Sequence, residues 1–267
     1  MLDMQTIFYF LVLGSFVGIV SGLFGIGGGG IIVPVLTTIF LAHGFDEHNV
    51  VHMALGTSMA IIIVTSISSI KAQQKKKAIV WDVVKMMAPG ILIGTFLATF
   101  IASKLDSFYL SIIFAIFMFY SAIQMFIGKK PKPDTKVFSN KIHFFSGGII
   151  GALSSLVSIG GGILSVPYLL IQNIDIKRAI ATSSAIGFPI ALSGTFGYIV
   201  NGWANTSMDT LTLGFVNLTA FACVAVASFL TAPIGVALVH KIDVNLMKKL
   251  FSLIPLVLSI KMIYSLI

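Results

Sequence analysis

The chain has 267 residues, of which 57% are hydrophobic and only 10% charged, and its mean hydropathy is +1.03. Soluble domains carry about 25% charged residues, so this composition excludes a soluble globular protein and indicates a polytopic membrane protein. The net charge of +8 does not indicate nucleic-acid binding, because membrane proteins collect basic residues in their cytoplasmic loops.

The first half of the chain opens with a long segment free of charged side chains, residues 6–45. As a single helix these 40 residues would be about 60 Å long, twice the thickness of the hydrocarbon core. The segment contains the run GLFGIGGGGIIVP at residues 22–34, and each glycine costs a helix about 1 kcal/mol relative to alanine. We therefore predict a glycine-broken helical hairpin, followed by three ordinary spans at residues 50–70, 86–103 and 108–127.

The second half of the chain has the same plan. A polar, lysine-rich segment at residues 128–141 precedes it, and residues 142–174 are again free of charged side chains. They contain the run SLVSIGGGILSVP at residues 155–167. We predict a second broken hairpin here, followed by spans at residues 179–200, 210–239 and 247–267.

The two halves align directly with one another. A shift of 133 positions places residues 18–36 on residues 151–169 with ten identities in 19 positions, and a shift of 125 places Gly56-Thr57-Ser58 on Ala181-Thr182-Ser183. We read the chain as an internal duplication. The predicted domains are a first transmembrane repeat, a basic cytoplasmic linker and a second transmembrane repeat, at residues 1–127, 128–141 and 142–267.

The distribution of basic residues predicts how the repeats are oriented. If each long uncharged segment crossed the membrane once, ten Lys and Arg residues would lie inside and six outside, a weak bias. If each segment enters and returns, fifteen lie inside and only Lys104 and Lys261 outside. The positive-inside rule favours the second arrangement. The predicted fold is therefore an all-α polytopic membrane protein with two inverted-topology repeats, each a glycine-broken helical hairpin followed by three transmembrane helices. The count leaves open whether the hairpins fully cross the bilayer or are re-entrant.

The glycine loops are the candidate binding site. Pro34 and Pro167 follow the glycines, and proline is favoured in the first turn of a helix, so the short helices at residues 31–42 and 164–171 should begin at the loops. Their free amides and dipoles would favour an anion, and repeat-matched hydroxyls would add donors. The alternative is that the glycines serve close helix packing and the hydroxyls join helices. The candidate substrate-binding residues are Gly27, Gly28, Gly29, Gly30, Thr57, Ser58, Gly160, Gly161, Gly162, Thr182, Ser183 and Ser184.

The centres of the predicted spans contain no charged side chains. No Asp, Glu, Lys or Arg lies near the centre of any of them, which argues against a carboxylate proton relay and fits an anion held by neutral donors. A coupled proton would travel on the substrate or use a histidine. We read His43, His48 and His52 as solvated residues of an outer loop. We predict no catalytic residues, because the spans contain no serine–histidine, paired-aspartate or HExxH arrangement. We also predict no metal site, because no cysteine or carboxylate pattern accompanies the three histidines, and no cofactor.

The paired segments GIGGGGIIVP at residues 25–34 and SIGGGILSVP at residues 158–167, with the Thr-Ser pairs after them, resemble the TauE/SafE family of sulfite exporters, also called the sulfonate uptake permease superfamily. The resemblance covers essentially the whole chain. The two loops differ, because Gly30 adds a fourth glycine to the first and Ser158 stands where the first has Gly25.

The resemblance implies a proton-coupled secondary transporter of small sulfur-containing anions, such as sulfite, sulfoacetate, thiosulfate or organosulfonates, that alternates access around the glycine loops. The expected partners are the anion, protons and the bilayer, with no nucleic acid, and the expected location is the cell membrane. The alternatives are a passive anion channel and a membrane scaffold subunit without a transport cycle. The transported anion, the direction of transport and a homo-oligomeric state are left open.

Overall fold

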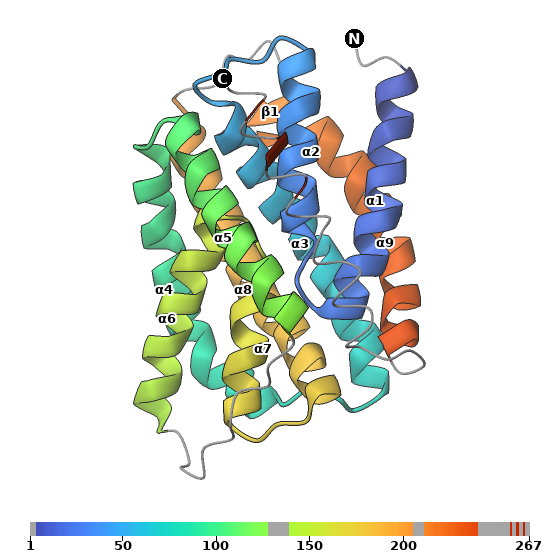
Figure 1. Ribbon diagram of the computed structural model, residues 1–267, viewed down its shortest axis with the longest axis vertical. Helices are drawn as coiled ribbons and strands as arrows, with labels where there is room; N and C mark the ends of the chain where they lie inside the picture. The colour runs from blue at the N-terminus through green and yellow to red at the C-terminus, as the bar shows by residue number, and fades with distance from the viewer. Residues whose placement is uncertain are drawn as a thin grey trace.

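The computed structural model is a bundle of helices and describes residues 4–127, 139–204 and 211–239, together with 257, 260, 261 and 264 (Figure 1). Most of the predicted linker and of the last predicted span, residues 247–267, lies outside these residues. Six of the helices are long and apolar enough to cross a membrane: α1 Met4–Phe24, α3 Val50–Lys75, α4 Trp81–Ser103, α5 Ser107–Ile127, α8 Ile176–Gly202 and α9 Leu218–Val239. The protein is therefore a multi-pass membrane protein, as its composition predicts.

Two helical hairpins are broken at the glycine runs. α1 is followed by the short helix α2, Gly29–Ala42, and α6, Asn140–Leu156, by the short helix α7, Gly162–Ile171. With 14 and 10 residues, the short helices extend only about 21 Å and 15 Å, less than the bilayer core. In Figure 1 the α1–α2 hairpin enters from the upper end of the molecule and the α6–α7 hairpin from the lower end, and both glycine loops lie in the interior.

Small residues let the long arms of the hairpins pack closely on the other half of the chain. α1 packs along α9, and α6 packs along α4. A Cβ atom on Gly14 would lie 2.5 Å from the carbonyl oxygen of Val224, and one on Gly147 would lie 2.5 Å from that of Met87. Membrane helices use glycine for such close approach. Each half of the chain is therefore held mainly by contacts with the other half.

α3 and α8 form the centre of the bundle, where they contact each other and both hairpins. Their central turns are buried, including Leu55, Met59 and Ile62 of α3 and Ile186 and Ile190 of α8. α3 follows the short helix α2 after a loop, and α8 follows the short helix α7 in the same way. The repeat-matched Thr-Ser pairs at residues 57–58 and 182–183 lie on these helices and are buried.

The span predicted at residues 210–239 is only partly helical. Helix was expected throughout residues 210–239, but the described residues there form a small antiparallel β-hairpin, β1 Thr212–Leu213 and β2 Val216–Asn217, and α9 begins only at Leu218. Gly214 takes a left-handed φ of 55° at the turn, and Phe215 is fully buried. The apolar residues of this segment resemble a helix in composition, but they cover the start of α3 as a compact turn.

The histidine prediction is wrong for one of its three residues. His43 and His48 are exposed, but His52 lies in the first turn of α3, only 2% exposed, with its ring stacked on Phe215 at 5.0 Å between centroids. Its Nε2 atom is 3.0 Å from the carbonyl oxygen of Ala102. The β-hairpin that covers this turn cannot be recognised in the sequence, so the burial of His52 could not be predicted.

An exposed ion pair joins two loops at this end of the bundle. His48 Nδ1 lies 3.1 Å from the Asp106 carboxylate, and this hydrogen bond raises the pKa of His48 above its ordinary value of 6.5. A hydrogen bond from the backbone N–H of Phe108, followed by the bond to His48, lowers the pKa of Asp106. The pair is therefore strongest at a pH above the lowered pKa of Asp106 and below the raised pKa of His48.

We expect the stability that this pair adds to fall as the pH rises. Because the pKa of folded His48 is raised, its contribution is complete below pH 6.5 and is lost as the pH passes the folded value. The difference in melting temperature between the wild type and Asp106→Asn should shrink between about pH 6 and pH 9. A difference that stays constant over this range would contradict the assignment. The effect should be small, because both side chains are exposed.

Candidate functional site

The two glycine loops cross each other in the interior of the protein. The backbone N–H of Gly160 donates a hydrogen bond of 3.0 Å to the carbonyl oxygen of Ile26. A Cβ atom on Gly27 would lie 2.9 Å from the Cα of Gly160, and one on Gly160 would lie 3.0 Å from the Cα of Gly27. The loops therefore touch backbone to backbone, at a point where neither chain has room for a side chain.

The same close approach holds at the first residue of each short helix. A Cβ atom on Gly29 would overlap the carbonyl oxygen of Ser158, and one on Gly162 would lie 2.5 Å from the carbonyl oxygen of Gly25. The packing explanation of the glycines is therefore correct for these positions. It does not exclude a binding role, because close packing of the loops also fixes where the helix ends point.

Both short helices begin at the loops, as the position of the prolines predicts. Gly28 and Gly161 precede them with left-handed φ values of 82° and 78° and offer no side-chain cap. In α2, the amides of Ile31 and Ile32 donate to the carbonyl oxygen of Gly28. Among the described residues we find no acceptor for the amides of the preceding positions, Gly29 and Gly30 in α2, or for the equivalent Gly162 and Ile163 in α7.

Two such helix ends in one region suit an anion. The first amides of a helix carry a partial positive charge and have no acceptor within the helix. Because the two loops are in contact, the amide ends of α2 and α7 are held close to each other. Phosphate, sulfate and carboxylate groups bind at ends of this kind. The donors at the loops are therefore of the kind that binds a small oxyanion without an opposite fixed charge.

Of the predicted hydroxyl groups, Ser58 is the one available to a ligand. Its Oγ is buried without a partner among the described residues and lies 3.3 Å from the place of a Cβ on Gly29. Ser183 donates to the carbonyl oxygens of Gly25 and Ile180, and Ser184 also donates to Ile180. Ser58 is thus placed beside the amide end of α2, whereas the serines of α8 are satisfied by the backbone.

The two threonines predicted as ligands bind backbone amides. Thr57 Oγ1 accepts a hydrogen bond of 2.9 Å from the N–H of Asn217, just before α9. Thr182 Oγ1 accepts one of 3.0 Å from the N–H of Val80, just before α4. Each threonine therefore ties the start of a helix from the other half of the chain to the central pair α3 and α8.

We expect Thr57→Val to weaken folding rather than ligand binding. Valine keeps the shape of threonine but leaves the buried N–H of Asn217 without its acceptor, which costs about 1–2 kcal/mol. The melting temperature in detergent should fall, whereas the dissociation constant of a bound anion should change little. A variant that keeps its melting temperature but loses anion binding would show instead that the Thr57 hydroxyl contacts the ligand.

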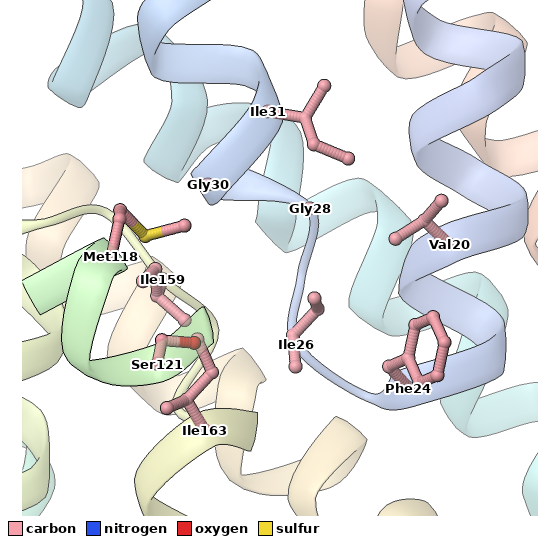
Figure 2. Close-up of a pocket in the computed structure, with 10 residues that line it drawn as sticks. All are labelled: Val20, Phe24, Ile26, Gly28, Gly30, Ile31, Met118, Ser121, Ile159 and Ile163. Atoms are coloured by element: carbon pink, nitrogen blue, oxygen red, sulfur yellow. The ribbon is translucent and has the colours of Figure 1, made fainter. Parts of the chain in front are cut away.

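A small cavity lies beside the first loop. It measures about 20 Å³ and is lined by Val20, Phe24, Ile26, Gly28, Gly30, Ile31, Met118, Ser121, Ile159 and Ile163. Figure 2 shows both hairpins and α5 contributing to it, with Met118 facing Gly30. This volume holds roughly one water molecule, so an oxyanion needs the surrounding elements to move apart.

Sequence reasoning missed three residues near this region. Met118 and Ser121 lie on α5, inside an ordinary apolar span, and Ser165 lies in the first turn of α7. Ser165 is fully buried, and its Oγ has no partner among the described residues. None of the three has an identical residue at the repeat-related position, so the repeat identity that supports most of the other candidates was absent.

The chain matches one protein family over nearly its whole length. The family described as "Sulfite exporter TauE/SafE" matches residues 10–262. A probable membrane transporter protein of Haemophilus influenzae is 36% identical over 253 residues, which cover 94% of this chain and 96% of the relative. One of Methanocaldococcus jannaschii is 31% identical over 238 residues, covering 87% of this chain and 86% of the relative. No solved structure matches the chain.

Proposed function

The chain belongs to the sulfite exporter TauE/SafE family and is a membrane transporter, and from this premise we propose that it carries small sulfur-containing anions by proton-coupled secondary transport. The proposed substrates are sulfite, sulfoacetate, thiosulfate or organosulfonates. One observation supports this most strongly: the amide ends of α2 and α7 meet in the interior beside the unpartnered hydroxyl of Ser58.

The proposed site is neutral. The residues that line the cavity include no acidic or basic side chain, and most of them are apolar, so the proposed donors to an anion are the amides and hydroxyls at the loops. Neutral donors in a low-dielectric site hold an oxyanion without an opposite fixed charge. Such a site releases its ligand more easily than one with a buried lysine or arginine, and a carrier needs to release its substrate in each cycle.

We propose that the two halves are inverted repeats and that access alternates between them. The loop contacts are the same in both directions when residues are matched by the shift of 133 positions. Gly29 packs on Ser158, and its equivalent Gly162 packs on Gly25, the equivalent of Ser158. Gly27 packs on Gly160, which is its own equivalent. Such reciprocal contacts are typical of a two-fold relation. The hairpins also enter from opposite ends of the bundle (Figure 1). Inverted repeats with broken helices at mid-depth are a known plan of secondary transporters.

The small size of the cavity supports a carrier rather than an open channel. The space beside the first loop holds about one water molecule, which is too little for an anion to pass at this point. Movement of one hairpin or of α5 would be needed to admit the anion from either side. A transport cycle with such a step should saturate with substrate.

Flux into proteoliposomes tests the proposal. Sulfoacetate and thiosulfate are suitable substrates because they remain charged, whereas sulfite forms membrane-permeant sulfur dioxide in acid. We expect saturable flux that increases with an imposed pH gradient and falls when an ionophore collapses the gradient. Protein-free liposomes provide the background rate. Flux that rises linearly with concentration and ignores the pH gradient would contradict the carrier and favour a passive channel.

A further inference from the structure

One face of α3 runs along the crossed loops. Ser58 lies beside Gly29, the side chain of Ile62 is 3.1 Å from the place of a Cβ on Gly27, and Ser66 Oγ is 3.4 Å from that of a Cβ on Gly187. These α3 residues are four apart and therefore share one helix face. The same face continues through Ser69 and Gln73 toward the lysine-rich end of the helix.

The far end of this face carries polar atoms without partners. Ser69 is 1% exposed and Gln73 is fully buried. Ser69 Oγ, Gln73 Oε1 and Gln73 Nε2 have no hydrogen-bond partner among the described residues. Buried polar groups are nearly always satisfied, and leaving them unpaired is costly. A buried glutamine with both amide atoms unpaired is therefore a position at which a polar ligand or a water molecule can bind.

The matching face of α8 carries different side chains with different hydrogen bonds. A shift of 125 positions places Ser183 on Ser58, Gly194 on Ser69 and Tyr198 on Gln73. Ser183 donates to the carbonyl oxygen of Gly25, and Tyr198 donates a bond of 3.0 Å to that of Ser155. The three α8 residues are therefore hydrogen-bonded or lack a side chain, whereas their three α3 counterparts keep polar atoms without partners.

We propose that Ser69 and Gln73 form a second station for the transported anion. It lies between the crossed loops and the end of α3, where Lys71 and Lys75 lie in the helix and Lys76 and Lys77 follow it. This inference rests on the proposed function and adds the route by which the anion reaches or leaves the loop site. Ser58 and Gln73 are 15 positions apart, about 22 Å along the helix. Two separate stations are therefore possible on one face.

The chemistry of the station matches that of the loop site. The Gln73 amide N–H and the Ser69 hydroxyl donate to an oxyanion, and Gln73 Oε1 accepts from a protonated anion or from its hydration water. Neutral donors bind weakly enough to pass the anion on, as conduction sites must. The lysines at the end of α3 raise the local concentration of anions near the proposed station.

Three variants in the proteoliposome assay test the station. Gln73→Leu removes its donors, and we expect maximal flux to fall at least about tenfold while the dissociation constant at the loop site changes less than about threefold. Gln73→Glu places a carboxylate in the route and should reduce anion flux further, because like charges repel. The matched control is Gln74→Leu, since Gln74 is the next residue, is exposed and binds the indole of Trp81. It should stay within about twofold of the wild type.

The outcomes separate this inference from the proposed function. If the wild type transports the anion and Gln73→Leu does so within about twofold of it, the second station is wrong and the loop site stands. If Gln73→Leu loses flux, binding and thermal stability together, Gln73 is structural and the station is again wrong. If Gln73→Glu transports normally, the residue serves water alone. If the wild type neither binds nor transports a sulfur oxyanion, the proposed function and this inference both fail.

Discussion

Gly29→Ala is expected to abolish anion transport. Its Cβ would overlap the carbonyl oxygen of Ser158, which belongs to the backbone of the other glycine loop and cannot rotate away. The two loops would have to separate, and the amide ends of α2 and α7 would lose their common position. Overpacking of a buried site costs typically 1–3 kcal/mol, and a clash with backbone should reach about 3 kcal/mol or more. Flux should fall at least about a hundredfold.

Gly148→Ala is the matched control for this variant. Gly148 also lies in a helix that packs closely, but a Cβ there would be 3.5 Å from the carbonyl oxygen of Gly90, an ordinary contact. It should keep its flux and its melting temperature. A Gly29→Ala protein that transports like Gly148→Ala would show that the loops are not held together at this point. Melting curves of both variants in detergent separate lost transport from lost folding.

Ser58→Ala is expected to weaken anion binding without weakening the fold. The Ser58 hydroxyl has no partner among the described residues, so removing it breaks no hydrogen bond of the protein. A hydrogen bond to a charged ligand contributes about 1.5–3 kcal/mol, which corresponds to a dissociation constant about 10- to 100-fold higher. The melting temperature without ligand should be unchanged or slightly raised, and the stabilisation by saturating anion should fall.

Ser228→Ala is the control for the loss of a buried serine. Ser228 is fully buried on α9, and its hydroxyl donates 3.0 Å to the carbonyl oxygen of Ala225 in its own helix. It should bind the anion as the wild type does. Equal dissociation constants for Ser58→Ala and the wild type would remove Ser58 from the site. A lower melting temperature for Ser58→Ala would mean that the hydroxyl has a structural partner.

The helical plan of the protein could be read from local signals in the sequence. The glycine runs and the prolines after them mark the breaks, and α2 and α7 begin two residues before the predicted starts at residues 31 and 164. The spans predicted at residues 50–70, 86–103, 108–127 and 179–200 correspond to α3, α4, α5 and α8. These signals are local, because charged residues mark the loops between spans, and glycine and proline break or start a helix at their own positions.

The roles of individual site residues depend on contacts that the sequence does not contain. Thr57 and Ser58 are neighbours with equal repeat support, yet Thr57 binds the N–H of Asn217 and Ser58 is unpaired. The reason is the β-hairpin before α9, which the apolar composition of residues 210–239 conceals. The glycines illustrate the same point. Their spacing predicts broken helices, but only the crossing of the loops shows that Gly29 and Gly162 also give room to a carbonyl oxygen.

The two halves of the chain differ in how buried polar groups are paired at matched positions of α3 and α8. In the α8 half, Tyr198 is fully buried and bonded to Ser155, and Phe215 fills the space over the start of α3. In the α3 half, Ser69 and Gln73 keep unpaired polar atoms. In the proposed carrier, Phe215 packs over the end where α3 begins, and the second station lies toward the end where α3 finishes. The proposed alternating access would reverse this arrangement in the other state of the transport cycle.

The position of a bound anion tests the central claim most directly. Selenite is a heavier analogue of sulfite, and its anomalous scattering locates it in crystals of the wild-type protein. We expect one strong peak within hydrogen-bonding distance of the Gly29 and Gly30 amides and of Ser58 Oγ, and loss of that peak in Gly29→Ala. Selenite found only at surface lysines, with the crossed glycine loops unoccupied, would contradict the account.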